Sequence, residues 1–213
     1  MNKKSIIHVQ KNEIFSSKAD VLNFLNSKTK KSEIEELFYF TVKEWKREPE
    51  KIIKEISKLF QKKIIIRSSA IGEDSIFNSQ AGSYDSVLNI NPRSKISIKQ
   101  AITKVISSYE KKKNFLINNK ILIQQQSQNI VTSGVVLTRV PESGAPYFVI
   151  NYDDTKATDT VTKGAVNNTI KIYKEIKKKK IPEKWVNLVS AILELESILI
   201  VAKIDKLLFK SSM

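Results

Sequence analysis

The sequence predicts an α+β fold for this chain of 213 residues. Apolar residues recur at helical spacing over about the first sixty positions, and short β-branched runs alternate with amphipathic stretches after Ile64. Helices that precede a mixed set of strands and helices are typical of this class. Apolar residues make up 41% of the chain, which is enough for a packed core. The length fits one large domain or two small ones.

The first part of the chain predicts three helices. Ser17 is a suitable cap for a short helix that ends at Asn26. Apolar residues then recur at helical spacing in two segments, 34–45 and 52–60. Pro49 separates these segments and is a natural first residue for the second of them.

Short β-branched and aromatic runs predict strands in the rest of the chain. The expected strands are 64–66, 87–90, 121–123, 135–137, 147–150 and 169–173. The turn Pro141-Glu142-Ser143-Gly144 joins the strands 135–137 and 147–150, which predicts an antiparallel hairpin. Amphipathic patterns predict one helix with apolar residues from Ile98 to Tyr109 and a last helix from Glu183 to about Val201.

Composition restricts the possible functions. The chain has no cysteine, which excludes disulfides, thiolate metal sites and cysteine nucleophiles and fits a reducing cytoplasm. It has no apolar run that could span a bilayer, and its first residues are too few and too polar for the pattern of a signal peptide, so we expect neither. The formal net charge is +15, which indicates either a polyanionic partner or a lysine-rich solvated surface. A nucleic-acid-binding module is one hypothesis that the positive charge leaves open. Arginine, the residue best suited to reading bases, is scarce, and this weighs against it.

The polar stretch from Arg67 to Ser86 is the most informative segment. It holds six serines and two glycines, and it follows the predicted strand 64–66 directly. Backbone N–H groups and hydroxyls in such a loop can surround phosphate oxygens, and a guanidinium at its start can hold a phosphate through two hydrogen bonds. The alternative is a surface loop with a solvent-facing arginine. Composition alone does not decide between them.

Four motifs in order carry a resemblance to a known family. They are Ser17-Lys18-Ala19-Asp20-Val21-Leu22, Ile66-Arg67-Ser68-Ser69-Ala70 with Glu73-Asp74 and Ala81-Gly82, Ile121-Leu122-Ile123-Gln124-Gln125-Gln126, and Ser133-Gly134-Val135-Val136-Leu137-Thr138-Arg139-Val140-Pro141. Together they resemble the nucleotide-binding domain of phosphoenolpyruvate synthase and pyruvate phosphate dikinase. The first motif lacks the glycines that the family usually places before its lysine.

The resemblance implies an ATP-grasp fold, in which two α+β lobes clamp ATP with Mg²⁺. By position in the motifs, Lys18 and Arg67 would bind the phosphates and Gly82 would pack its backbone against them. Ser86 would offer a hydroxyl, and Gln124 would face the nucleotide. The Gln125-Gln126 backbone would read the adenine edge. The implied ATP-binding residues are thus Lys18, Arg67, Gly82, Ser86, Gln124, Gln126 and Thr138.

Several family features are missing from the sequence. The acidic metal ligands and the glutamine-x-arginine motif of the family do not follow Gly164, and Glu194 and Glu196 are expected to face solvent. The family's phosphohistidine lies on a separate domain, and His8 has no matching motif around it. We therefore expect no catalytic residue in this chain. We expect it to be the N-terminal domain of a larger phosphotransferase, incomplete at its C-terminus, with sub-lobes 1–115 and 116–213.

The resemblance also suggests an acceptor. The segment 147–164 and the altered lysine motif look closest to a branch that includes the L-glutamine kinase of capsular phosphoramidate synthesis, which forms AMP and phosphate. Residues 151–164 fit either a polar turn or a second phosphate contact through Thr162 or Lys163. A degenerate domain that binds nucleotide without catalysis is a further alternative. The expected partners are ATP and a small phosphate acceptor on another domain, with no membrane.

Overall fold

The computed structural model describes residues 17–71, 84–111, 115–155 and 168–210, with side chains described as far as residue 199. These residues form two compact units. The first takes its residues from Met1–Thr29, Glu33–Gln126 and Ile200–Met213, and the second from Lys30–Ser32 and Ser127–Leu199. Helices and antiparallel sheets occur in both units, which confirms the predicted α+β class.

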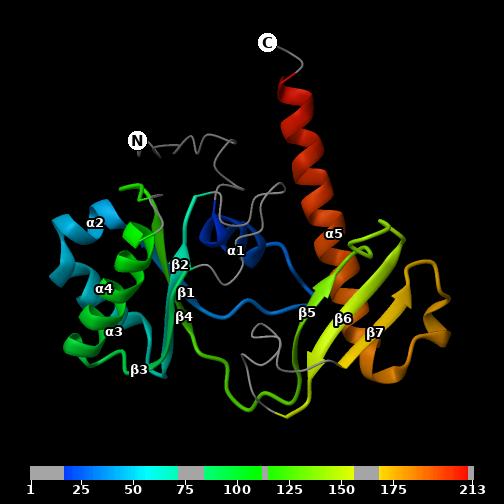
Figure 1. Ribbon diagram of the computed structural model, residues 1–213, viewed down its shortest axis with the longest axis horizontal. Helices are drawn as coiled ribbons and strands as arrows, with labels where there is room; N and C mark the ends of the chain where they lie inside the picture. The colour runs from blue at the N-terminus through cyan, green and yellow to red at the C-terminus, as the bar shows by residue number, and fades with distance from the viewer. Residues whose placement is uncertain (1–16, 72–83, 112–114, 156–167, 211–213) are drawn as a thin grey trace, which may run out of the picture. The chain divides into compact units, whose positions relative to one another are not determined.

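A four-stranded antiparallel sheet forms the centre of the first unit, in the order β1-β4-β2-β3. Its strands are β1 (Leu37–Thr41), β2 (Ile64–Ser69), β3 (Ser86–Ile90) and β4 (Lys120–Gln125). Its helices are α1 (Lys18–Asn26), α2 (Val42–Arg47), α3 (Pro49–Leu59) and α4 (Lys95–Lys111). Figure 1 shows α2, α3 and α4 on one side of the sheet and α1 on the other.

The core of the first unit lies between the sheet and the helices α3 and α4. Ile64 and Ile66 of β2, Ile123 of β4, and Ile56 and Ile102 of the helices are fully buried there. The predicted helices 52–60 and 98–109 and the strands 64–66, 87–90 and 121–123 are confirmed. Burial of these isoleucines and of the aromatic residues around them supplies the main stabilisation of the unit.

The predicted helix over 34–45 is wrong in its first part. Residues Leu37–Thr41 form β1, which pairs with β4, and α2 begins only at Val42. The segment Phe38-Tyr39-Phe40-Thr41 is aromatic and β-branched, and such residues pack well on a pleated surface. Phe40 is buried in the core, and Phe38 packs against it. A short apolar run fits helical spacing and a strand equally well, so the pattern alone misleads here.

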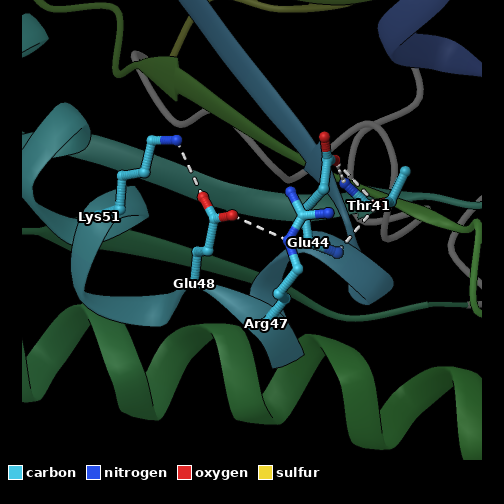
Figure 2. A network of polar contacts seen from close by, with 5 residues as sticks. All are labelled: Thr41, Glu44, Arg47, Glu48 and Lys51. Carbon is cyan, nitrogen blue, oxygen red and sulfur yellow. Dashed lines mark hydrogen bonds and ion pairs between the residues drawn. The ribbon is translucent and has the colours of Figure 1, made fainter.

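The start of α2 and its junction with α3 are fixed by polar contacts (Figure 2). Thr41 and Glu44 form a reciprocal capping box, in which each side chain binds the other residue's backbone N–H. Glu48 then accepts hydrogen bonds from Arg47 Nε at 2.8 Å and from Lys51 Nζ at 2.9 Å. These cations, and the bond from Lys51 above all, lower the pKa of Glu48. Pro49 is the first residue of α3, as predicted.

The second unit is a three-stranded antiparallel sheet in the order β5-β6-β7, with a long helix along it (Figure 1). Its elements are β5 (Ser133–Leu137), β6 (Tyr147–Asp153), β7 (Asn168–Tyr173), the 3-10 helix η2 (Lys178–Lys180) and the part of α5 (Glu183–Lys210) that ends at Leu199. The predicted hairpin and the strand 169–173 are confirmed.

The predicted start of α5 is confirmed, and the helix ends at Lys210, past the expected end near Val201. Phe148, Trp185 and Ile192 lie in the core of the second unit, between α5 and the sheet. In the described part of the chain, no helix is both long enough and apolar enough to cross a membrane.

Candidate functional site

One face of the four-stranded sheet carries three of the residues singled out in the sequence. Arg67 of β2 lies directly opposite Ser86 of β3 and Leu122 of β4. Gln124 lies opposite Ile65, two residues before Arg67 on the same strand. Opposed residues share a face and side chains alternate along a strand, so Arg67, Ser86 and Gln124 lie on one face. We call it the Arg67 face; the core helices α3 and α4 cover the other.

The first turn of α1 is attached to the Arg67 face. Ser69, two residues after Arg67, therefore points to the same side, and its Oγ accepts a hydrogen bond from the backbone N–H of Ala19 at 2.8 Å. Lys18 is the first residue of that helix. The structure thus brings Lys18 and Arg67 to the same side of the sheet, at the end where β2 leads into the loop.

The predicted polar loop is shorter than expected because its first three residues belong to β2. Residues 70–71 and 84–85 are its described ends, and Gly82 lies outside the described residues. Tyr109 of α4 fixes the strand end, since its hydroxyl accepts from Ser69 N–H at 2.9 Å. Beyond β2, the N–H of Ile71 donates to Asn119 Oδ1 at 3.1 Å. These bonds hold the entrance of the loop in a defined position.

Arg67 is half-buried, with its Nε shielded from solvent. Its neighbours along the strand, Ile66 and Ser68, are buried on the opposite face. Ser86, which faces it across the sheet, is exposed. A guanidinium keeps its charge at all relevant pH values and presents a planar set of donors to an anion. Because Arg67 belongs to β2, its backbone is held by the sheet, and this suits an arginine that binds a phosphate.

The strand end at Gln124–Gln126 is tied to its neighbours. The N–H of Gln125 donates to the Glu36 carbonyl at 3.0 Å, and the N–H of Gln126 donates to the Lys63 carbonyl at 2.9 Å. The Gln126 side chain is bound to Asn89, accepting from its N–H at 2.8 Å and donating to its Oδ1 at 3.0 Å. Both backbone N–H groups therefore have protein partners, and the side chain of Gln126 serves to hold β3 and β4 together.

Thr138 belongs to the second unit, directly after β5. Gly134, in the same motif, is required by space, because a Cβ there would lie 2.5 Å from the carbonyl oxygen of Asn151 on β6. Gly144 closes the hairpin with a left-handed φ of 68° and donates its N–H to the Val140 carbonyl at 2.8 Å. Gly134 of the motif and Gly144 of the turn therefore both shape the hairpin.

The expectation that Glu194 and Glu196 face solvent is wrong. Both are half-buried on α5. Glu194 accepts hydrogen bonds from the backbone N–H groups of Lys30 and Lys31, each at 3.0 Å, and the Lys31 bond above all lowers the pKa of this carboxyl. Glu196 pairs with Lys174 at 2.5 Å. Their partners are distant in sequence, so helical periodicity could not reveal them.

Three residues of the site were not predicted as such. Tyr109 was expected only as an apolar position of a helix, and nothing in the sequence pairs its hydroxyl with Ser69. Asn89 has a left-handed φ of 61°, a conformation that asparagine tolerates better than most residues. Asn119 is 1% exposed, and a buried amide needs hydrogen-bond partners. Its position just before the predicted strand 121–123 is the one sequence signal that pointed to it.

Comparison with known proteins identifies the family of the chain. No curated protein gives a significant match. Residues 3–203 match the family described as pyruvate phosphate dikinase, AMP/ATP-binding domain. This span is most of the 213 residues and contains both the Arg67 face and the hairpin after β5. The chain therefore belongs to the family of the AMP/ATP-binding domain of pyruvate phosphate dikinase.

Proposed function

We propose that the chain binds ATP with the triphosphate at the α1 end of the Arg67 face. One observation carries this proposal: the hydrogen bond between Ala19 N–H and Ser69 Oγ brings the helix of Lys18 to the strand of Arg67. Two cations on one side of a sheet can neutralise a polyphosphate together. Phosphoryl transfer depends mainly on such positioning and charge neutralisation.

The roles of the other residues follow from the motifs. Ser86 is proposed as a hydroxyl donor beside Arg67, and Gln124 as a side chain that faces the nucleotide. The carbonyl oxygens of Gln125 and Gln126 are proposed for the adenine edge, since their N–H groups bind Glu36 and Lys63. The proposed contacts of Gly82 and Thr138 rest on the family motifs alone.

Mg²⁺ is proposed to arrive with ATP. Magnesium in such sites is commonly held by phosphate oxygens, waters and one or two carboxylates. Among the described residues there is no group of three or more acidic, histidine or cysteine side chains that could hold a metal by itself. The residues present therefore fit a metal carried mainly by the triphosphate, whose charge it would partly neutralise beside Lys18 and Arg67.

A second, more specific proposal concerns the molecule that accepts the phosphate. We propose that the chain is the ATP-binding part of a larger phosphotransferase that passes phosphate through a phosphohistidine of another domain, with L-glutamine as a candidate acceptor. The resemblance of segment 147–164 supports L-glutamine, and part of that segment lies outside the described residues. Formation of AMP from ATP by the whole enzyme, dependent on L-glutamine, is the expected result. Equal AMP formation without L-glutamine would exclude it as the acceptor.

Calorimetric titration of the chain with ATP and Mg²⁺ tests the proposed binding. Arg67→Ala removes charge-assisted hydrogen bonds worth about 1.5–3 kcal/mol, so we expect the dissociation constant to rise at least about tenfold. Arg93→Ala is a matched control, because Arg93 is an exposed arginine of the same unit whose guanidinium donates to Gln61. The proposal is wrong if the wild type does not bind ATP, or if Arg67→Ala binds it as the wild type does.

A further inference from the structure

A shielded ion pair joins α1 to the Arg67 face. Asp20, in the first turn of α1, pairs with Lys120, the first residue of β4. Only 11% of the Asp20 side chain and 19% of the Lys120 side chain are exposed. The Oγ of Ser17 also donates to Asp20 Oδ2 at 2.6 Å, and the Lys120 ammonium lies 5.3 Å from the centre of the Tyr39 ring. The lysine thus has a carboxylate and an aromatic ring as partners.

The pair differs from the other ion pairs described in the first unit. The pairs that Glu48 makes with Arg47 and Lys51, and the pair between Glu50 and Lys99, have side chains that are 35% to 72% exposed. Exposed pairs contribute little, typically about 0–1 kcal/mol. Removal of one partner from a shielded pair is far more costly, because the other charge stays behind without compensation. The pair of Asp20 and Lys120 is therefore the strong polar attachment of α1.

The register of the sheet shows what this attachment positions. Lys120 lies directly opposite Ser69 of β2, so its side chain emerges on the Arg67 face next to the serine that binds Ala19 N–H. Residues 19 and 20 of α1 are thus held at adjacent points of the same face. Lys18 precedes them by one residue. Its location relative to Arg67 is set by these two attachments.

We propose that Asp20 and Lys120 are positioning residues for the triphosphate: their ion pair holds the first turn of α1 so that Lys18 lies beside Arg67. This inference rests on the proposed function. Asp20 neutralises the charge of Lys120, so Lys120 serves to hold the helix and is not itself proposed to contact the phosphates. A carboxylate in the first turn of a helix also interacts favourably with the helix dipole.

In a variant that still folds, loss of the pair is expected to weaken the binding of phosphate-bearing ligands and not that of ligands without phosphate. Without it, the first turn of α1 is held less firmly, although Ala19 stays buried and bonded to Ser69, and ATP must order the turn on binding. That ordering cost lowers the affinity for a ligand that contacts Lys18. Adenosine has no phosphate and does not use Lys18, so its affinity is expected to stay the same. A purely structural role of the pair would affect both ligands alike.

The test is a calorimetric comparison of ATP and adenosine on the full chain, with the folding of each variant checked by thermal unfolding. We expect Asp20→Asn and Lys120→Gln each to weaken ATP binding about tenfold, which is about 1.4 kcal/mol, and to leave adenosine binding within about twofold. Lys120→Arg keeps the pair and is expected to retain most of the affinity for ATP. Glu50→Gln breaks the exposed pair with Lys99 and serves as the matched control, with no expected change.

Two results would overturn this inference and leave the proposed function standing. The first is ATP binding by folded Asp20→Asn that equals or exceeds that of the wild type. The second is a loss in Lys120→Gln alone, which would assign Lys120 a direct contact with phosphate. If Asp20→Asn does not fold, the ratio of ATP affinity to adenosine affinity is compared between Lys120→Gln and Lys120→Arg. An equal ratio in these two variants would overturn the inference. Absence of ATP binding by the wild type would overturn the proposed function and this inference together.

Discussion

The hydroxyl of Tyr109 bridges two strands of the first sheet, since it accepts from the N–H of Ser69 at 2.9 Å and donates to the carbonyl of Lys120 at 2.5 Å. Tyr109 is fully buried. We expect Tyr109→Phe to lower the free energy of unfolding by about 1–3 kcal/mol, because a buried N–H group loses its partner. Urea unfolding at equilibrium measures this change.

Tyr173→Phe is the control for that substitution. The Tyr173 hydroxyl bonds Glu175 at 3.1 Å on the surface of the second unit, so its loss is expected to change the free energy of unfolding by no more than about 0.5 kcal/mol. A Tyr109→Phe variant as stable as Tyr173→Phe would contradict the structural role of the bridge.

Gly134→Ala is expected to destabilise the second unit by about 1–3 kcal/mol, because the added methyl group has no room against the backbone of β6. The Asn151 carbonyl oxygen would lie 2.5 Å from it. Gly144→Asn is the comparison: its Cβ meets nothing within 4 Å, and asparagine tolerates a φ of 68°. In thermal unfolding, Gly144→Asn should have a clearly higher melting temperature than Gly134→Ala. The opposite order would refute the close approach of β5 and β6.

Asn89 separates the effect of backbone conformation from that of a hydrogen bond. Asn89→Gly loses the side-chain bond from Gln126 but accepts the left-handed φ of 61° without strain. Asn89→Ala loses the same bond and adds about 1 kcal/mol of strain. Urea unfolding is therefore expected to give the order wild type, Asn89→Gly, Asn89→Ala. Equal stability of the two variants would show that the strain is relieved elsewhere.

We expect the carboxylate of Glu194 to make a pH-dependent contribution to the stability of the fold. Its pKa is lowered in the folded protein from the usual value of 4.5, chiefly by the hydrogen bond from the Lys31 backbone. A lowered folded pKa means that the stabilisation is present above the unfolded pKa and is lost as the pH falls through the folded pKa. Wild type is expected to exceed Glu194→Gln in melting temperature at pH 7, with the difference shrinking below about pH 4.5.

The pH series needs a second glutamate for comparison. Glu142 is exposed in the hairpin turn, and no hydrogen bond or ion pair is described for its side chain. Glu142→Gln therefore serves as the control for the substitution itself, and we expect its melting temperature to follow that of the wild type from pH 7 to pH 4. A difference between wild type and Glu194→Gln that stays constant down to pH 3 would exclude the ionised carboxylate as the source of the stabilisation.

The regular parts of the fold could be predicted from the sequence because their local patterns agree with their tertiary role. Ile52, Ile53 and Ile56 recur at helical spacing on α3, and they are buried for that reason. The run Ile64-Ile65-Ile66 forms a strand buried in part on both faces. At Leu37–Thr41 the apolar pattern fits both the helical and the strand period. The segment forms a strand because it pairs with β4, which lies about eighty positions away in the sequence.

The candidate site could be predicted only in its residue types and order. Arg67 and Ser69 stood out because a polar, serine-rich segment follows an apolar strand. That they share a face with Lys120 depends on strand register, which the sequence does not specify. The contacts of Asp20 with Lys120, and of Glu194 with Lys30, join residues at least 100 positions apart. No local pattern contains that information.

The tripeptide Lys30–Ser32 has a practical consequence. It belongs to the second unit although the residues on both sides of it belong to the first, and its N–H groups bind a carboxylate 164 positions further along the chain. An excised fragment that starts at Ser127 would lack these donors, and Glu194 would then be left to water. Proteolytic nicking near residue 30 should therefore loosen a helix that begins more than 150 residues later.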